Sequence, residues 1–385
     1  MKNTIKILQI NKLYFPWIGG METVVQNISE GLKNNFYFFN KKQNNFYLEV
    51  LTCGTKRKTK IEIINKIKIT KAGSLGIFLS MPISFLFPFI LRKKIKKFNI
   101  LHFHLPFPLG VMSYLFFCLK NKNQKIVVTW HSDILKQKIF LWFYKPFLIM
   151  FLKRTDKIIV TSTNYLKKSP FLKNFKNKCV VIPIALDVKK FQTLQEKRID
   201  IKNPKNKKII LFVGRLSYYK GLNYLIKAMN NVNALLLIVG NGSLKQKLKK
   251  QMTELKLNEK IIFLHNLQNE ELKYCYNIAS IFVLPSIEKT EAFGIVQLEA
   301  MLAKIPVVNT NLPTGVPFVS IDNKTGITVP PKNSDALSRA INYLLQNPEL
   351  ARAMGQNGKK RVEQMFSLDK MLQEIEKIYG DLIKN

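Results

Sequence analysis

Short apolar runs alternate with longer amphipathic stretches along most of this 385-residue chain. Such alternation predicts parallel strands joined by crossover helices, because neighbouring parallel strands need a long connection between them. In the first half the runs lie at residues 5–10, 47–51, 100–104, 125–129, 157–161 and 180–182. In the second half they lie at 209–213, 234–239, 261–264, 281–284 and 306–309, and a further short strand is expected within 325–331. The sequence therefore predicts an α/β fold.

A polar stretch rich in Lys, Gln and Asn separates the two series of strands, between residues 187 and 208. It predicts two Rossmann-like parallel-sheet domains that face one another across a cleft at the carboxyl ends of their strands. We expect a first domain at 1–188, a linker at 189–207 and a second domain at 208–366. A final helical segment is expected at 367–385.

The chain is strongly basic, with 62 Lys and Arg against 24 Asp and Glu and a net charge of +38. This charge favours anionic partners such as nucleic acid, acidic lipid head groups or phosphorylated substrates. A codon bias that fills the surface with lysine is the alternative, and composition leaves both open. The four cysteines are widely spaced and suggest neither a zinc site nor a disulfide framework, which fits a reducing cytoplasm. The N-terminal apolar run is too short for a signal peptide.

Two stretches combine apolar and basic residues, at 75–97 and 139–154. The first carries Pro82 and Pro88 in its apolar part and is slightly short for a membrane span. Both are typical of helices that lie at a membrane interface, with ordinary buried helices as the alternative.

The segment EAFGIVQLE carries two glutamates, Glu291 and Glu299, and follows the apolar run at 281–284. Their spacing of eight residues is near a multiple of the helical repeat, so Glu299 is expected about two turns into the following helix, facing the same cleft as Glu291. The backbone N–H groups of Gly294 and Ile295 are expected near that helix start, where anions bind. Carboxylates for hydroxyls beside N–H groups for phosphate suggest a nucleotide-sugar site.

Two cations, Arg215 and Lys220, follow the first strand of the second domain, in the motif VGRLSYYKG. Such fixed cations can hold a diphosphate, and an arginine can do so with two hydrogen bonds. No Asp-x-Asp occurs in the chain, so we predict neutralisation by these cations and no bound metal. In the first domain, Gly19 and Gly20 permit close approach of the backbone to a ligand, and they do not form a dinucleotide fingerprint.

His131, in the motif TWHSD, is expected at the carboxyl end of a strand, where it could hydrogen-bond a sugar hydroxyl or the reacting centre. His102 and His104 alternate along a strand and share one face, although no third ligand for a metal is evident.

The order and spacing of these motifs resemble family 4 retaining glycosyltransferases of the GT-B fold. The similarity runs from GGMETVVQNISEGL through TWHSD, VGRLSYYKG, VGNGSLKQKL and EAFGIVQLEAM to TGITVPP, and so covers nearly the whole chain. Two turns depart from the family pattern, because Ala185 and Lys304 stand where the family usually has glycine. The resemblance also implies that the last helix crosses back onto the first domain.

The resemblance assigns roles to individual residues. Glu291 would contact hydroxyls of the sugar that is transferred, Glu299 the nucleotide ribose, and His131 the hexose. The full set of expected contacts with the nucleotide sugar, including the segment around His265 that would flank the base, is Gly19, Gly20, Gly214, Arg215, Lys220, His265, Leu267, Glu291, Phe293, Gly294, Ile295 and Glu299. Glu291, His131, Arg215 and Lys220 would serve catalysis. No cofactor is expected.

The predicted function is retaining transfer of a hexose from a nucleoside-diphosphate sugar, GDP-mannose-like or UDP-hexose, to a lipid-linked glycan of a surface polysaccharide, O-antigen or lipopolysaccharide. The protein is expected in the cytoplasm, in peripheral contact with the anionic inner membrane. One alternative is a soluble or phospholipid acceptor. The other is a basic nucleic-acid-binding protein without catalysis, although recognisable motifs for nucleic acid are missing and the charge is spread along the chain.

Overall fold

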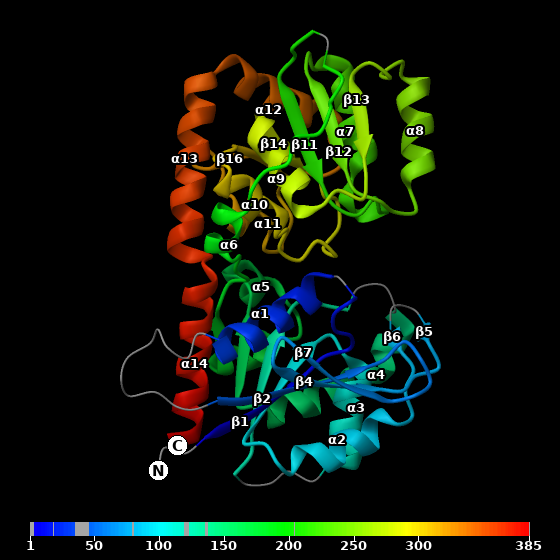
Figure 1. Ribbon diagram of the computed structural model, residues 1–385, viewed down its shortest axis with the longest axis vertical. Coiled ribbons are helices and arrows are strands. Elements are labelled where there is room, and N and C mark those ends of the chain that lie inside the picture. The colour runs from blue at the N-terminus through cyan, green and yellow to red at the C-terminus, as the bar shows by residue number, and fades with distance from the viewer. Residues whose placement is uncertain are drawn as a thin grey trace. The chain divides into compact units, whose positions relative to one another are not determined.

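A computed structural model of the chain describes residues 4–17, 19–34, 46–78, 81–118, 123–134, 138–203 and 205–384. The chain forms two compact units (Figure 1). Unit 1 comprises residues 1–184 together with 368–385, and unit 2 comprises residues 185–367.

Unit 1 is built on an eight-stranded sheet in the order β10-β9-β8-β7-β1-β2-β4-β3. The strands are β1 (Ile5–Ile10), β2 (Phe46–Cys53), β3 (Lys60–Ile64), β4 (Ile67–Ala72), β7 (Ile100–Leu105), β8 (Lys125–Trp130), β9 (Lys157–Val160) and β10 (Cys179–Val181). Every pairing in the sheet is parallel except that of β3 with β4. The six strands expected for the first half are therefore all present, in a parallel sheet.

The β3–β4 hairpin was not among the expected elements. Its turn residues Asn65 and Lys66 both have positive φ, 48° and 66°, as a two-residue hairpin turn requires. The alternating isoleucines on either side of this turn are the signal that indicates the hairpin. It adds an antiparallel edge to an otherwise parallel sheet.

The helices of unit 1 are α1 (Gly20–Asn34), α2 (Phe87–Ile95), α3 (Pro108–Phe117), α4 (Lys138–Arg154), α5 (Thr163–Lys168) and α14 (Leu368–Lys384), with a 3₁₀ helix, η2 (Lys173–Lys178). The apolar stretch 75–91 is not one interfacial helix, as its composition suggested. It begins with two short paired strands, β5 (Ile77–Phe78) and β6 (Met81–Pro82), and only its last residues belong to α2. Pro82 pairs within β6, and Pro88 lies in the first turn of α2, where a proline is tolerated.

The C-terminal helix α14 belongs to unit 1. It packs against α1, where the side chain of Leu372 lies so close to Gly31 that a Cβ there would be 2.4 Å from it. Tyr379, in the same helix, is fully buried and hydrogen-bonds to Gln9 of β1 and His102 of β7. The helix thus contributes a side chain to the polar interior of the sheet.

Unit 2 contains a fully parallel six-stranded sheet in the order β13-β12-β11-β14-β15-β16. The strands are β11 (Ile209–Val213), β12 (Leu235–Val239), β13 (Ile261–Leu264), β14 (Ile281–Leu284), β15 (Val307–Thr310) and β16 (Gly326–Val329). Three of the expected strands have the predicted bounds, and the other three agree closely. Within the unit the sheet order reads 3-2-1-4-5-6, the arrangement of nucleotide-binding doubly wound folds. Its order reverses between β11 and β14, and ligands bind such sheets at this point.

The helices of unit 2 are α6 (Val188–Thr193), α7 (Leu222–Ala228), α8 (Lys245–Glu254), α9 (Asn269–Ile278), α10 (Val296–Leu302), α11 (Val316–Val319), α12 (Ser334–Gln346) and α13 (Pro348–Met365), with the 3₁₀ helices η3 (Tyr218–Lys220) and η4 (Met229–Asn231). The stretch 189–207, expected as a linker, lies within this unit. It is attached to α9, because Lys197 N–H donates to the Glu270 carbonyl and Asn277 Nδ2 donates to Glu196 Oε2 at 2.7 Å.

Candidate functional site

The loops that follow β11 and β14 meet where the sheet order of unit 2 reverses. Gly221 ends η3 in the β11 loop with φ +67°, and a Cβ there would lie 2.1 Å from the Pro285 carbonyl oxygen. Ile287 N–H also donates to the Tyr219 carbonyl at 2.8 Å. The two loops are therefore held in direct backbone contact, and Gly221 is required for that approach.

A buried ion pair lies between these loops. Lys220 Nζ is 2.6 Å from Glu291 Oε2, and both side chains are less than 10% exposed. Ser286 Oγ donates to the same carboxylate oxygen at 2.9 Å. The other oxygen, Glu291 Oε1, accepts no hydrogen bond from the described residues. One oxygen of the carboxylate is thus fixed by the protein, and the other remains available to a ligand hydroxyl.

Gly214, directly after β11, has φ +152°, and a Cβ there would lie 3.4 Å from Lys220 Nζ. Arg215 comes next and is exposed, and its guanidinium makes no hydrogen bond or ion pair with the described residues. The β11 loop therefore presents one buried cation held by a carboxylate and one exposed cation without a protein partner. This combination leaves room for an anion beside the sheet.

Gly294 has φ +75°, and a Cβ at this position would lie 2.6 Å from the Leu284 side chain. The N–H groups of Gly294 and Ile295 make no hydrogen bond with the rest of the described chain, so both are free for an anion. Residues 291–295 are not helical, and the helix α10 begins only at Val296. The prediction that Glu299 lies two turns into the helix was therefore wrong, and it lies in the first turn.

Glu299 is held by a residue of α9 rather than by the Lys220–Glu291 pair. Tyr276 Oη donates to Glu299 Oε2 at 2.6 Å. Burial raises the pKa of the Glu299 carboxyl, and the Tyr276 hydrogen bond opposes that shift. No hydrogen bond joins Glu299 to Glu291 or Lys220 within the described residues, so the two glutamates belong to separate parts of the same edge of the sheet.

The remaining predicted residues of unit 2 differ in their surroundings. Phe293 is 2% exposed and packs edge-on against Phe366 with ring centroids 6.0 Å apart, so its side chain supports the loop from inside. His265 and Leu267 follow β13, the edge strand, and β12 separates that strand from β11. They share the carboxyl edge of the sheet with Arg215 and Lys220 but make no direct contact with them in the described structure.

In unit 1, Gly20 is the first residue of α1, as the Gly-Gly turn predicts. A Cβ at Gly19 would lie 2.4 Å from Glu22 Oε2. Glu22 is a residue that sequence reasoning did not single out. It is 6% exposed, and its Oε1 has no hydrogen-bond partner in the described chain.

His131 follows β8 at its carboxyl end and is 6% exposed. Its loop is fixed by Asp133, whose Oδ1 accepts from Trp130 Nε1 at 3.0 Å and from Ser169 Oγ at 2.8 Å. The Trp and Asp of the TWHSD motif therefore hold the turn that carries the histidine. Burial, and then the charge of Lys12, lower the pKa of His131 to about 3.

His102 and His104 lie on one face of β7 with their rings stacked 4.5 Å apart, as their alternation predicts. Burial lowers the pKa of both, that of His102 to about 3. Among the described residues, no group of three or more His, Cys, Asp and Glu is placed to hold a metal ion. The expectation of a metal-free site stays a prediction.

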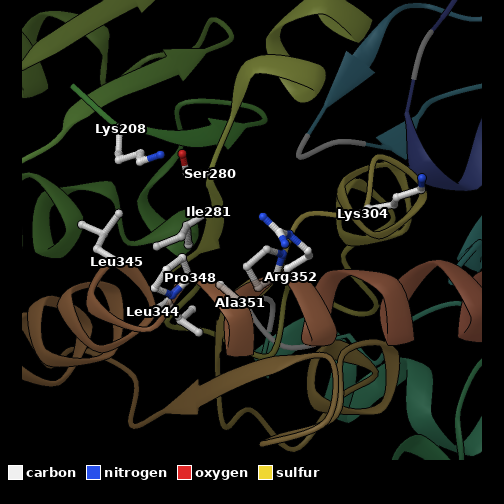
Figure 2. Close-up of a pocket in the computed structure, with 10 residues that line it drawn as sticks. Lys208, Ser280, Ile281, Lys304, Leu344, Leu345, Pro348, Ala351 and Arg352 are labelled. Atoms are coloured by element: carbon white, nitrogen blue, oxygen red, sulfur yellow. The ribbon is translucent and has the colours of Figure 1, made fainter. Parts of the chain in front are cut away.

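A separate pocket of about 220 Å³ in unit 2 is lined by Lys208, Ser280, Lys304 and Arg352, among others (Figure 2). Lys208 and Ser280 directly precede β11 and β14. The pocket is therefore at the amino ends of the strands, the edge opposite to Glu291 and Lys220. Ligands of doubly wound sheets bind at the carboxyl edge, so this pocket is not the candidate site.

Ser286, Gln9 and Tyr379 are further residues that were not predicted from the sequence. Ser286 was overlooked although it follows β14 by only two residues, at the carboxyl edge of the sheet. Gln9 and Tyr379 lie inside apparently ordinary apolar segments, 370 residues apart, and no local pattern joins them.

Comparison with known proteins agrees with this architecture. Residues 18–190 match the family model "Glycosyltransferase Family 4", and residues 194–361 match "Glycosyl transferases group 1". The chain is 30% identical over 389 aligned residues to O-antigen chain mannosyltransferase C of Escherichia coli, covering 99% of this chain and 100% of that protein. It is 32% identical to the D-rhamnosyltransferase WbpZ of Pseudomonas aeruginosa, covering 72% of each.

Solved structures show the same fold. Sucrose-phosphate synthase from Thermosynechococcus elongatus superposes with a TM-score of 0.77 at 22% identity, covering 99% of both chains. Anabaena HepE in complex with UDP gives a TM-score of 0.75 at 17% identity, covering 98% of this chain and 100% of that one. The chain belongs to glycosyltransferase family 4, with the GT-B fold. The predicted family and fold class are confirmed.

Proposed function

We propose that the protein transfers a hexose from a nucleoside-diphosphate sugar to a lipid-linked glycan, with retention of the anomeric configuration. The observation that carries this proposal is the Lys220–Glu291 pair at the point where the sheet order of unit 2 reverses. It combines a fixed cation with a carboxylate that keeps one oxygen free, at the place where such sheets bind nucleotides.

The chemistry assigns each group a task. Arg215 and Lys220 neutralise the diphosphate, and the free N–H groups of Gly294 and Ile295 donate hydrogen bonds to sugar or phosphate oxygens. Glu291 accepts a hydrogen bond from a sugar hydroxyl through Oε1. Glu299 contacts the ribose through the oxygen that Tyr276 leaves free, and the segment at His265 and Leu267 flanks the base.

Retention follows if the acceptor attacks from the face that the diphosphate leaves. The bond from the anomeric carbon to the diphosphate oxygen breaks while the bond to the acceptor oxygen forms. The acceptor hydroxyl proton passes to the departing phosphate, so no protein group has to carry it. Catalysis then rests on positioning and on cations that stabilise the leaving charge.

The sugar and the acceptor are proposed from the relatives. Two relatives, which cover 99% and 72% of the chain, are named as a mannosyltransferase and a rhamnosyltransferase, the first of an O-antigen chain. Solved neighbours bind UDP or UDP-glucose. We therefore favour a GDP-mannose-like or UDP-hexose donor and a lipid-linked glycan of a surface polysaccharide, O-antigen or lipopolysaccharide.

A surface of unit 1 supports an acceptor at a membrane. Helices α2, α3 and α4 lie side by side (Figure 1). The ring centroids of Phe89 and Phe117 are 5.5 Å apart, and those of Phe116 and Phe147 are 5.4 Å apart. Their large exposed apolar side chains are Phe89, Phe116, Phe117, Phe140, Trp142, Phe143 and Met150. Trp142 is the most exposed of these side chains, at 72%.

Basic residues lie on the same helices, with Arg92 and Lys93 exposed on α2 and Lys145 and Lys153 exposed on α4. None of the helices in the described ranges is long and apolar enough to span a bilayer. Aromatic side chains beside exposed cations suit a surface that contacts anionic head groups. The proposed location is the cytoplasmic face of the inner membrane, with peripheral contact.

Turnover tests the proposed reaction. The full chain is incubated with UDP-, GDP- and dTDP-hexoses and a polyprenyl-diphosphate-linked glycan, or with the same glycan in soluble form, and release of nucleoside diphosphate is measured. We expect release with one class of nucleotide sugar and a strong preference for the lipid-linked acceptor. Equal rates with the soluble glycan would instead support the soluble-acceptor alternative, and absence of release with every donor would contradict transfer.

Flotation with vesicles tests the membrane contact. Wild type should float with vesicles that contain phosphatidylglycerol at low salt and much less at high salt, because screening weakens the attraction. The double variant Trp142→Ser, Phe143→Ser should float less at both salt concentrations. Tyr343→Ser, which changes a similarly exposed aromatic residue on α12 of unit 2, serves as the control and should float like wild type.

A further inference from the structure

A chain of buried hydrogen bonds runs through the interior of unit 1 and ends at His131. His104 Nε2 is 2.8 Å from Gln9 Oε1, and His104 Nδ1 is 3.0 Å from His131 Nε2. Gln9 Nε2 donates to Tyr379 Oη at 3.1 Å. All four side chains are at most 6% exposed, so these contacts are sheltered from solvent.

With the Gln9 amide in this orientation, the partners fix where each proton lies. An amide oxygen only accepts, so His104 Nε2 must carry a proton and donate it to Gln9 Oε1. His104 is neutral, because burial holds its pKa well below the usual value. Its Nδ1 therefore has a lone pair and accepts from His131 Nε2. His131 is neutral as well, which leaves its Nδ1 without a proton.

The direction of the whole chain follows from the orientation of the Gln9 amide, which also contacts Tyr379. The Tyr379 hydroxyl accepts from Gln9 Nε2 and donates to His102 Nδ1 at 2.6 Å, and His102 Nε2 donates to Thr129 Oγ1 at 2.7 Å. With the amide reversed, Gln9 would donate to His104, and His131 would carry its proton on Nδ1. The orientation of one amide thus selects the tautomer of His131.

His131 Nδ1 makes no hydrogen bond with the described residues. The geometry points to Gln9 and His104 as positioning residues that hold His131 in its neutral Nε2–H tautomer, so that Nδ1 accepts a hydrogen bond from a hydroxyl of the bound sugar. The identity of that hydroxyl as part of the transferred hexose rests on the proposed function, whereas the tautomer does not. The site then selects a sugar with a hydroxyl at that position, because a fluoro or methoxy substituent cannot donate.

Nitrogen-15 NMR of the histidine-labelled full chain at pH 7 tests the tautomer directly. The chain has only four histidines, so single substitutions assign every signal. We expect His131 to give the pattern of a neutral ring protonated on Nε2. A proton on Nδ1, or a cationic ring, would overturn the proposal. This readout requires no catalytic turnover, so it stands even if the proposed transfer reaction fails.

Gln9→Met tests whether the chain sets that tautomer. Met is close to Gln in length and offers no amide, so both tautomers should appear at His104 and His131. Thr70→Val is the matched control, since it removes a buried polar group of the same sheet, a hydroxyl without a hydrogen-bond partner in the described chain. It should leave the wild-type pattern. Unchanged signals in a folded Gln9→Met protein would refute the role of Gln9, and the wild-type spectrum decides the tautomer if that variant does not fold.

Substrate analogues test the selection of a hydroxyl. Among monodeoxyfluoro analogues of the accepted sugar, one should lower wild-type kcat/KM by about tenfold, the effect of one lost hydrogen bond. In the His131→Ala variant, the same fluoro analogue should lower kcat/KM little further. An unchanged penalty in His131→Ala, or no analogue with a penalty in wild type, would contradict the contact.

Discussion

The two units hold their candidate functional groups in opposite electrostatic states. In unit 2, Lys220 and Glu291 form a buried ion pair beside the exposed Arg215. In unit 1, His131 ends a chain of uncharged groups. The difference suggests that unit 2 maintains charges to meet a diphosphate, while unit 1 excludes charge where a neutral sugar is recognised.

The largest effect is expected from breaking the ion pair of unit 2. Lys220→Met leaves Glu291 buried without its cation, which should lower the free energy of unfolding by about 3–5 kcal/mol. Lys332→Met is the control, because Lys332 and Glu288 form an exposed pair 3.7 Å apart, worth at most about 1 kcal/mol. Urea denaturation followed by far-UV circular dichroism measures both.

A double variant, Lys220→Met with Glu291→Gln, should recover a substantial part of that loss, because the buried charge is then removed. If the single variant is as stable as wild type, or the double variant less stable than the single one, the pair does not hold the two loops as described.

Acid should destabilise unit 1 before unit 2. The folded pKa of His102 and of His131 is about 3, below the usual value of 6.5, so the unfolded chain takes up protons first as the pH falls. Stability is therefore complete above about pH 6.5 and declines toward pH 3, by about 2 kcal/mol per histidine between pH 6.5 and pH 5. In unit 2, burial raises the pKa of Glu299, which works in the opposite direction and favours the folded state as the pH falls.

Tryptophan fluorescence reports on unit 1, because Trp17, Trp130 and Trp142 all lie there. Hydrogen exchange of the strands of unit 2 gives the second probe. We expect the fluorescence transition at a higher pH than the loss of protection in unit 2. Coincident transitions, or the reverse order, would contradict the contrast between the two units.

Arg215→Ala should affect binding of the sugar nucleotide without affecting the fold. A charge-assisted hydrogen bond to phosphate contributes about 1.5–3 kcal/mol, so the dissociation constant should rise by at least about tenfold. Unfolding stability should stay within about 0.5 kcal/mol of wild type, because the side chain is exposed. Titration calorimetry with the accepted nucleotide sugar checks the first point, and equal affinity in the variant would remove Arg215 from the site.

The smallest effect concerns Lys304, which has φ +60° where the family usually has glycine. A non-glycine residue in this conformation costs about 1–2 kcal/mol of folding free energy, a strain that glycine avoids. Glycine also gives the unfolded chain more conformational entropy, which offsets part of that gain in stability. Lys304→Gly should therefore raise stability by up to about 1 kcal/mol, and Lys304→Ala should not. Thermal unfolding of the two variants distinguishes them, and a destabilised Lys304→Gly would show that the lysine side chain stabilises this turn.

Sequence reasoning predicted the elements of this fold well because apolar runs mark buried parallel strands directly. It also placed Glu291 and Lys220 in the loops at the carboxyl edge of the second sheet, because both follow such runs closely; their roles stay predictions. It misjudged the position of Glu299, since helical periodicity was assumed through residues 291–295, where the chain is not helical.

The polar interior of unit 1 was beyond its reach. Gln9 and Tyr379 are joined only through the packing of α14 on the sheet, and single-sequence patterns do not reveal contacts across 370 residues. The β3–β4 hairpin was overlooked for a different reason, since its turn was visible in the sequence and was not used.

The proposal that the carboxyl ends of β11 and β14 bind a nucleoside-diphosphate sugar is tested best by thermal stabilisation with nucleotide sugars. Wild type, Arg215→Ala and Lys332→Met are each unfolded with UDP-, GDP- and dTDP-hexoses in excess. A ligand at 100 times its dissociation constant adds about 2.7 kcal/mol of stability. We predict a raised Tm for wild type and Lys332→Met with one nucleotide class, and a smaller rise for Arg215→Ala. An equal rise in all three proteins, or no rise with any sugar, would contradict it.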